Sequence, residues 1–210
     1  TPRALLNPSG MSIPGVRREP LPGLRPGDAE DMISACGVSG TSETIQAYLQ
    51  ENCDCHPLVI GVLAGLINDY LIDRGNFDRW ADDANYGGQL NLAELDLVGR
   101  RNHILRAALD ALPEPGRQLL STLALLYGAA DYETLSAFNP HLPSKPEEVC
   151  EPEDIESKLL DTVRDLEARG LLQYDAGEKR WDLHPVVRGV TAGGLRSEEM
   201  ETLGQKVVDH

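Results

Sequence analysis

The chain of 210 residues is poor in aromatic side chains, in basic charge and in long apolar runs. Aromatic residues make up only 5% of it, so a core has to be built from aliphatic side chains. The apolar stretch 58–67 is far shorter than the roughly 20 residues of a membrane-spanning helix. No basic segment followed by an apolar one marks a secretion signal. We therefore expect a globular protein of one large or two small domains.

The shortage of basic residues also limits the partners. The formal net charge is −15, and such a field repels nucleic acid and anionic membranes. It does not prevent a single nucleotide from binding in a pocket that is locally positive.

Cysteine is sparse as well, with Cys36, Cys53, Cys55 and Cys150. The stretch Cys53-Asp-Cys-His56 does not have the CxxC spacing of a zinc site, and no second cysteine pair follows. We expect reduced cysteines, a cytoplasmic protein and no metal site.

Common catalytic motifs are missing. In Gly10-Met-Ser-Ile-Pro-Gly15-Val-Arg17 the glycines have P-loop spacing, but valine and arginine replace the lysine and hydroxyl residue that bind phosphates and Mg²⁺. No HExxH or GxSxG pattern is present. We therefore expect no catalytic residues and no ATPase activity from this chain alone.

Helical patterns dominate what remains. Segment 56–72 carries Gly61 and Gly65 on one helical face, where another backbone can approach closely. Segment 154–170 is amphipathic, and the strand, turn and strand that follow it end at His184. Helices followed by a β-hairpin are the order of a winged helix. We predict a mostly α fold with a helical lid domain and a winged-helix domain, preceded by a short remnant of an α/β nucleotide-binding domain.

The predicted segments follow from shifts in composition. They are a Pro- and Gly-rich edge of the nucleotide-binding domain (1–27), the helical domain (28–84), a linker (85–103), the winged-helix domain (104–195) and the start of a further helical segment (196–210).

Three residues are candidates for a binding site. His184 ends a strand just before Pro185 begins a helix, and free N–H groups at a helix start attract anions. His184 can equally be a helix cap, and Pro57 can be an ordinary first-turn proline or an apolar platform for a base. Arg3 is either a solvated arginine or a sensor of the γ-phosphate at a strand end.

The order of these motifs resembles the NB-ARC group of STAND nucleotide switches over residues 1–195. Cys55-His-Pro57-Leu is similar to the family's Gly-x-Pro-Leu motif, with cysteine in place of glycine. Leu183-His-Pro185 resembles the Met-His-Asp motif, and Thr1-Pro-Arg3 resembles a sensor strand end that normally reads Thr/Ser-Thr/Ser-Arg.

The resemblance implies a switch that ADP closes and ATP opens. It implies that Pro57 packs on adenine, that His184 holds the β-phosphate of ADP, and that Arg3 senses the γ-phosphate. Mg²⁺ would bind only through the missing P-loop domain. The implied partners are that domain, an effector, a sensor and, after activation, further copies of the protein.

Two alternatives remain open. One is a nucleotide-independent scaffold for protein interactions. The other is a winged-helix DNA-binding regulator, which segment 154–170 disfavours because its acidic residues outnumber its basic ones.

Overall fold

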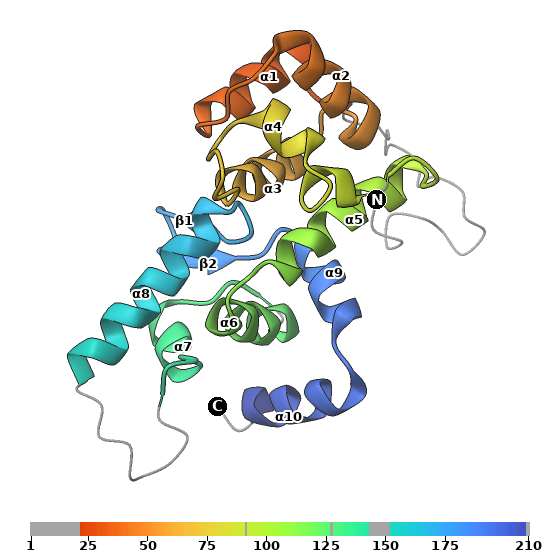
Figure 1. Cartoon of the computed structure of the whole chain (residues 1–210). Helices are drawn as coiled ribbons and strands as arrows, with labels where there is room; N and C mark the ends of the chain where they lie inside the picture. Colours follow the sequence, from red (N-terminus) through yellow and green to blue (C-terminus); the bar gives the residue numbers. More distant parts are fainter. Residues whose placement is uncertain (1–21, 91, 127, 143–151, 209–210) are drawn as a thin grey trace, which may run out of the picture.

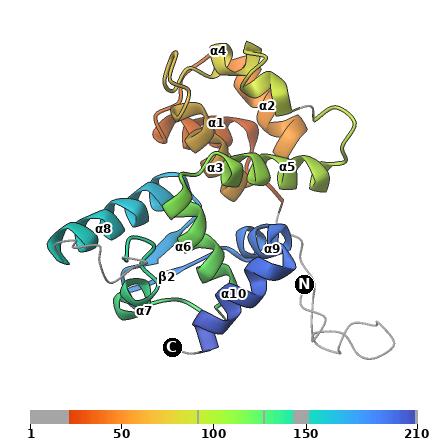
Figure 2. The ribbon, with the colours of Figure 1, turned by 60° about the horizontal axis from the view of Figure 1, so that its bottom comes forward.

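The computed structural model describes residues 22–90, 92–126, 128–142 and 152–208. The described chain is mostly helical with one small antiparallel sheet, as predicted, and it forms a helical unit and a winged-helix-like unit (Figures 1 and 2). The predicted remnant of a nucleotide-binding domain falls largely on residues 1–21, outside the described residues.

The first unit is built around one apolar helix. Its elements are α1 (Pro26–Ala35), α2 (Ser42–Cys53), α3 (Pro57–Asn68), α4 (Phe77–Asp82) and a 3-10 turn (Gly87–Leu90). Most of α3 is buried, because α1, α2 and α5 all pack against it. Phe77 and Trp80 of α4 close the same core, with Tyr48 of α2 at their edges.

Helix α5 (Leu97–Asp110) joins the two units. It begins inside the segment 85–103 that was expected to be a linker. Asp96 accepts a hydrogen bond from the Gly99 N–H at 2.7 Å, so the helix has an ordinary acidic cap. Ile104 packs in the first core, whereas Leu105 packs in the second. A single rigid helix therefore contributes to both cores.

The second unit has the predicted order of helices and hairpin. Its elements are α6 (Glu114–Leu125), α7 (Tyr132–Ala137), α8 (Pro152–Ala168), β1 (Gln173–Asp175), β2 (Arg180–Asp182), α9 (Pro185–Gly194) and α10 (Ser197–Val208). Tyr174 of β1 lies opposite Trp181 of β2. Trp181 also bridges to Ala130 and donates its indole N–H to Glu167 on α8, which ties the hairpin to both neighbours. Helix α10 forms in the tail where a helix was predicted.

The two units meet where the turn after α8 crosses α3. A Cβ added to Gly65 would lie 3.1 Å from the Cα of Arg169, so the backbones touch. Gly170 adopts a left-handed conformation (φ +68°), and a Cβ there would lie 3.3 Å from the carbonyl carbon of Gly61. Arg169 pairs with Asp69 just beyond the end of α3. The predicted close approach of another backbone is confirmed at Gly65, whereas a Cβ on Gly61 would meet nothing within 4 Å.

This contact predicts opposite effects for two alanine substitutions on α3. Gly65→Ala should lower the free energy of unfolding by about 1–2 kcal/mol, because the methyl group crowds the Arg169 backbone. Gly61→Ala is the matched control: its Cβ would meet nothing within 4 Å, so removing a helical glycine should raise stability by up to about 1 kcal/mol. Urea unfolding measures both, and equal changes would contradict the contact.

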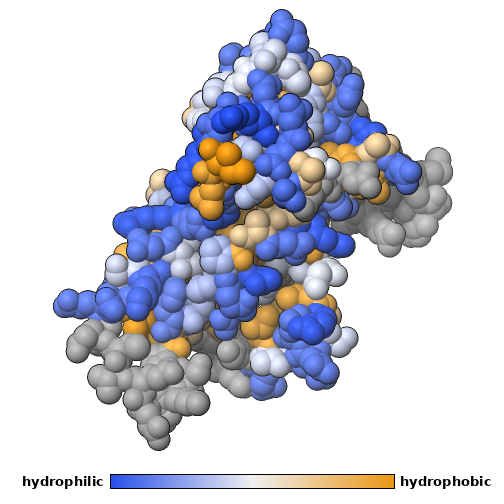
Figure 3. Space-filling view, viewed as in Figure 1, coloured by the Kyte–Doolittle hydropathy of each residue, from blue (hydrophilic) through white to orange (hydrophobic). Residues whose placement is uncertain are grey.

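The surface is mainly polar, as the content of charged residues in the sequence leads one to expect. The face in Figure 3 is mainly hydrophilic, with small separate apolar patches. Within the described ranges, no helix combines the length and apolar character that crossing a bilayer requires.

Candidate functional site

The candidate site begins at the turn between α2 and α3. Asp54 and Cys55 both have positive φ angles, 51° and 49°. Each such non-glycine residue costs about 1–2 kcal/mol, so the turn needs support. Arg101 of α5 supplies it by donating to the Cys53 carbonyl at 3.0 Å and pairing with Asp54 at 3.1 Å. The Leu24 N–H adds a bond to the Cys55 carbonyl at 2.9 Å.

The turn leads directly into the start of α3, where backbone N–H groups of the first turn lack acceptors within the helix. His56 is the N-cap residue, and Pro57 occupies the first turn, where it is exposed. The first backbone bond of α3 runs from the Ile60 N–H to the His56 carbonyl. The N–H groups of Leu58 and Val59 therefore have no acceptor inside the helix and point toward its start. They form a small anion-attracting end.

The start of α9 also carries a histidine N-cap and a first-turn proline, but here the histidine ring caps the helix. His184 is the N-cap, and its Nδ1 accepts from the Val186 N–H at 3.2 Å. In the neutral ring this acceptor role places the proton on Nε2, which is then available as a donor. Pro185 occupies the first turn. Arg188 fixes α9 by donating to the Leu123 carbonyl on α6 at 2.6 Å.

The two helix starts bring two histidines together. The ring centroids of His56 and His184 lie 6.3 Å apart, with the rings nearly perpendicular (88°). Burial lowers the pKa of His56, and the charges of Arg101 and His184 lower it further, against a smaller opposing effect of Asp54. Arg101 therefore lies close enough to act on His56, although its own charge is paired with Asp54.

The structure brings two of the three predicted residues near each other and leaves the third undescribed. Pro57 follows His56 at one helix start, and His184 caps the other. Arg3 lies outside the described residues. His56 and Arg101 were missed by the sequence analysis, since His56 lies within the quoted motif but its partner is on α9, and Arg101 was assigned to a linker.

The two cysteines of the Cys53-Asp-Cys-His56 stretch serve packing. Cys53 is fully buried and donates its S–H to the Leu49 carbonyl at 3.0 Å, and Cys55 is also buried. The part of the chain that the structure describes holds no group of three or more His, Cys, Asp or Glu side chains placed to bind a metal ion. Burial raises the pKa of the Cys53 thiol to about 12 and raises the pKa of Cys55 as well.

These thiols predict a pattern of alkylation. Because the thiolate is the reactive form, iodoacetamide at about pH 8 should modify exposed Cys36 in the folded protein and leave Cys53 and Cys55 unmodified. In urea all three should react. Mass spectrometry of tryptic peptides measures the sites, and rapid labelling of Cys53 or Cys55 in the folded protein would show that the turn before α3 is open.

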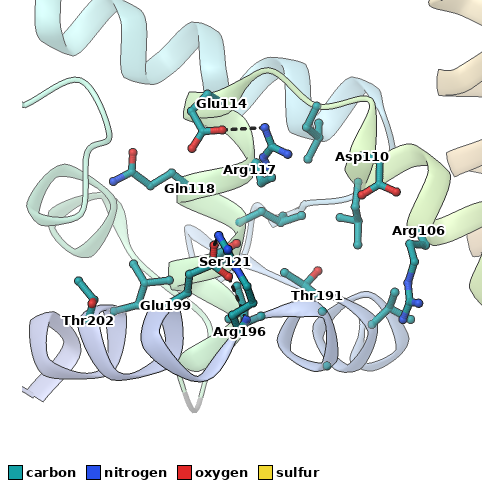
Figure 4. Close-up of a pocket in the computed structure, with 18 of the residues that line it drawn as sticks. Arg106, Asp110, Glu114, Arg117, Gln118, Ser121, Thr191, Arg196, Glu199 and Thr202 are labelled. Atoms are coloured by element: carbon teal, nitrogen blue, oxygen red, sulfur yellow. Dashed lines mark hydrogen bonds and ion pairs between the residues drawn. The ribbon is translucent and has the colours of Figure 1, made fainter.

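A cavity lies away from these two helix starts, in the second unit. It has a volume of about 1010 Å³ and is bounded by α5, α6, α9 and α10. Figure 4 shows Ser121 on α6 and Thr191 on α9 facing it, with the ion pairs Glu114–Arg117 and Arg196–Glu199 at its walls. Its charged residues are of both signs, and neither Pro57 nor His184 lines it. The sequence analysis did not predict it.

Comparison with known proteins gives one informative similarity. No protein-family model matches the sequence, and no curated protein matches it. The structure is similar to the crystal structure of a Signal Transduction ATPase with Numerous Domains (STAND) protein with a tetratricopeptide repeat sensor from Pyrococcus horikoshii. The TM-score is 0.54 at 18% sequence identity, over 93% of this chain and 23% of that chain. The fold is therefore STAND-like, and the chain spans about a quarter of the length of that protein.

Proposed function

We propose that the chain is the regulatory part of an ADP/ATP-dependent STAND switch of the NB-ARC type. Two observations support this proposal. The fold resembles part of a STAND protein over almost the whole chain. Within that fold, two helix starts from different units converge, and each carries a histidine and a first-turn proline. The convergence is the observation that carries the proposal, because it places a histidine from each unit beside the other, at parts that a switch has to hold together.

The residues fit the diphosphate end of ADP. Nδ1 of His184 accepts the capping bond, and no hydrogen bond to its Nε2 occurs among the described residues, so Nε2 can donate to a β-phosphate oxygen while His184 keeps its capping role. The N–H groups at both helix starts add partial positive charge. Pro57 is exposed and offers an apolar ring on which adenine can pack. Arg3 would reach the γ-phosphate in the ATP-bound state.

The remaining parts of the switch lie in other domains. The 210 residues contain no P-loop lysine, so a separate P-loop domain would hold the phosphates from the opposite side and bind Mg²⁺. An effector and a sensor would complete the protein. Activated copies would associate with one another once the closed form opens.

ADP would act by favouring one arrangement of the two units. A ligand shifts an equilibrium only by its difference in affinity for the two states. A site made of one helix start from each unit provides that difference, because it is complete only when α3 and α9 are close. If the two units separated, the phosphate would lose the groups that one of the two helix starts supplies.

Replacement of His184 tests this function in the full-length protein. His184→Ala should speed ADP dissociation by about tenfold or more, because a hydrogen bond to a charged group contributes about 1.5–3 kcal/mol. Basal oligomerisation should rise with it. Dissociation of a fluorescent ADP analogue and light scattering measure the two effects.

His103→Ala provides the control, because His103 is exposed on α5 and should leave ADP retention unchanged. If His184→Ala left both ADP dissociation and oligomerisation unchanged, His184 would be only a helix cap. Absence of a P-loop motif upstream in the gene would favour a nucleotide-independent scaffold instead.

A further inference from the structure

We propose that His56 is a second ligand for the diphosphate, so that ADP retention is coupled to uptake of a proton. This inference rests on the function proposed above and concerns the same site. It assigns a role to a residue that the resemblance leaves without one.

The first argument is that the ring of His56 is not used by the fold. His56 and His184 are both N-cap residues, but only His184 accepts a backbone N–H. His56 Nδ1 is buried and has no hydrogen-bond partner among the described residues. Leaving a buried polar atom unpaired is unfavourable, and a bound partner is one way to satisfy it.

The second argument is the position of the ring. His56 faces His184 across 6.3 Å, and the described residues show no hydrogen bond between the two side chains. Each ring sits at a helix start that attracts negative charge. A diphosphate offers several oxygens, so one group can accept from both rings. Two histidines on different units would then bind one ligand, and His56 would further stabilise the closed, ADP-bound form.

The charges around His56 set the direction of the pH effect. Arg101 from α5 and His184 from α9 disfavour its protonation, and Asp54 in the preceding turn favours it. Cys55 beside it keeps a raised pKa and is uncharged near neutral pH. Arg25, from the segment that crosses the turn, is paired with Asp28 and exposed. Burial and the charges of Arg101 and His184 together lower the pKa of the ring in the absence of a ligand.

A bound diphosphate would favour the protonated form of His56 instead. Its negative charge raises the pKa of His56, as an opposite charge within about 4–6 Å does. Protons are then taken up on binding wherever the pH lies between the free and bound pKa values. ADP affinity therefore rises as pH falls through the bound pKa, and the gain is complete below the free pKa. The switch would hold ADP more firmly in acidified cytosol.

The test compares ADP dissociation from the full-length protein at about pH 6.5 and about pH 8, for the wild type and for His56→Gln, His184→Gln and His103→Gln. Wild type and His103→Gln should release ADP several-fold more slowly at the lower pH. His56→Gln should release it about tenfold faster than wild type at the lower pH and lose most of the pH dependence. The comparison cancels titration of ADP itself, which is the same for every variant.

The outcomes separate the two proposals. If ADP binds and His184→Gln speeds its release while His56→Gln behaves as wild type at both pH values, this inference is overturned and the proposed function stands. If the protein retains no ADP, or His184→Gln has no effect, the proposed function is overturned and this inference with it. If His56→Gln fails to fold, the NMR titration of the His56 ring in the wild type decides: its midpoint should rise by about one pH unit with ADP, and an unchanged midpoint overturns the inference.

Discussion

Close contact between α3 and the turn after α8 determines how the two units of this protein are arranged. Gly65 allows the Arg169 backbone to reach the helix, and Gly170 provides the left-handed turn that the approach requires. The ion pair of Arg169 with Asp69 then fixes the turn at the far end of α3. Helix α5 reinforces the arrangement, because it packs in both cores.

The site at the start of α3 depends on this arrangement. Since α3 is held along its length, its first turn is directed to a fixed place, and Arg101 keeps the strained turn before it in position. Arg188 anchors α9 to α6 in the same way. The two histidines can therefore face each other without being bonded to each other. The two rings lie close only while both units are in contact, which is the property that the proposed nucleotide-controlled switch requires.

Local sequence patterns were enough to predict much of the fold. The apolar face of α8, the hairpin and the glycine face of α3 all appear as short-range periodicities, and His184 was placed correctly at a helix start. The start of α5 was missed, because its first turns combine exposed Leu97 and Val98 with a glycine and polar residues, and their packing against α2 is a tertiary effect. His56 was missed for the same reason: nothing in its neighbours along the chain indicates that α9 lies opposite. The cavity beside α10 also arises from packing of distant helices.

The central claim is that a nucleotide diphosphate binds between the two histidines. The most direct measurement is a crystal structure of the full-length protein with ADP. We predict density for the β-phosphate between the His56 and His184 rings, with adenine on Pro57. Density for ADP in the cavity between α6 and α10 would contradict the claim. So would a structure in which other domains hold the phosphates and both histidine rings have no partner.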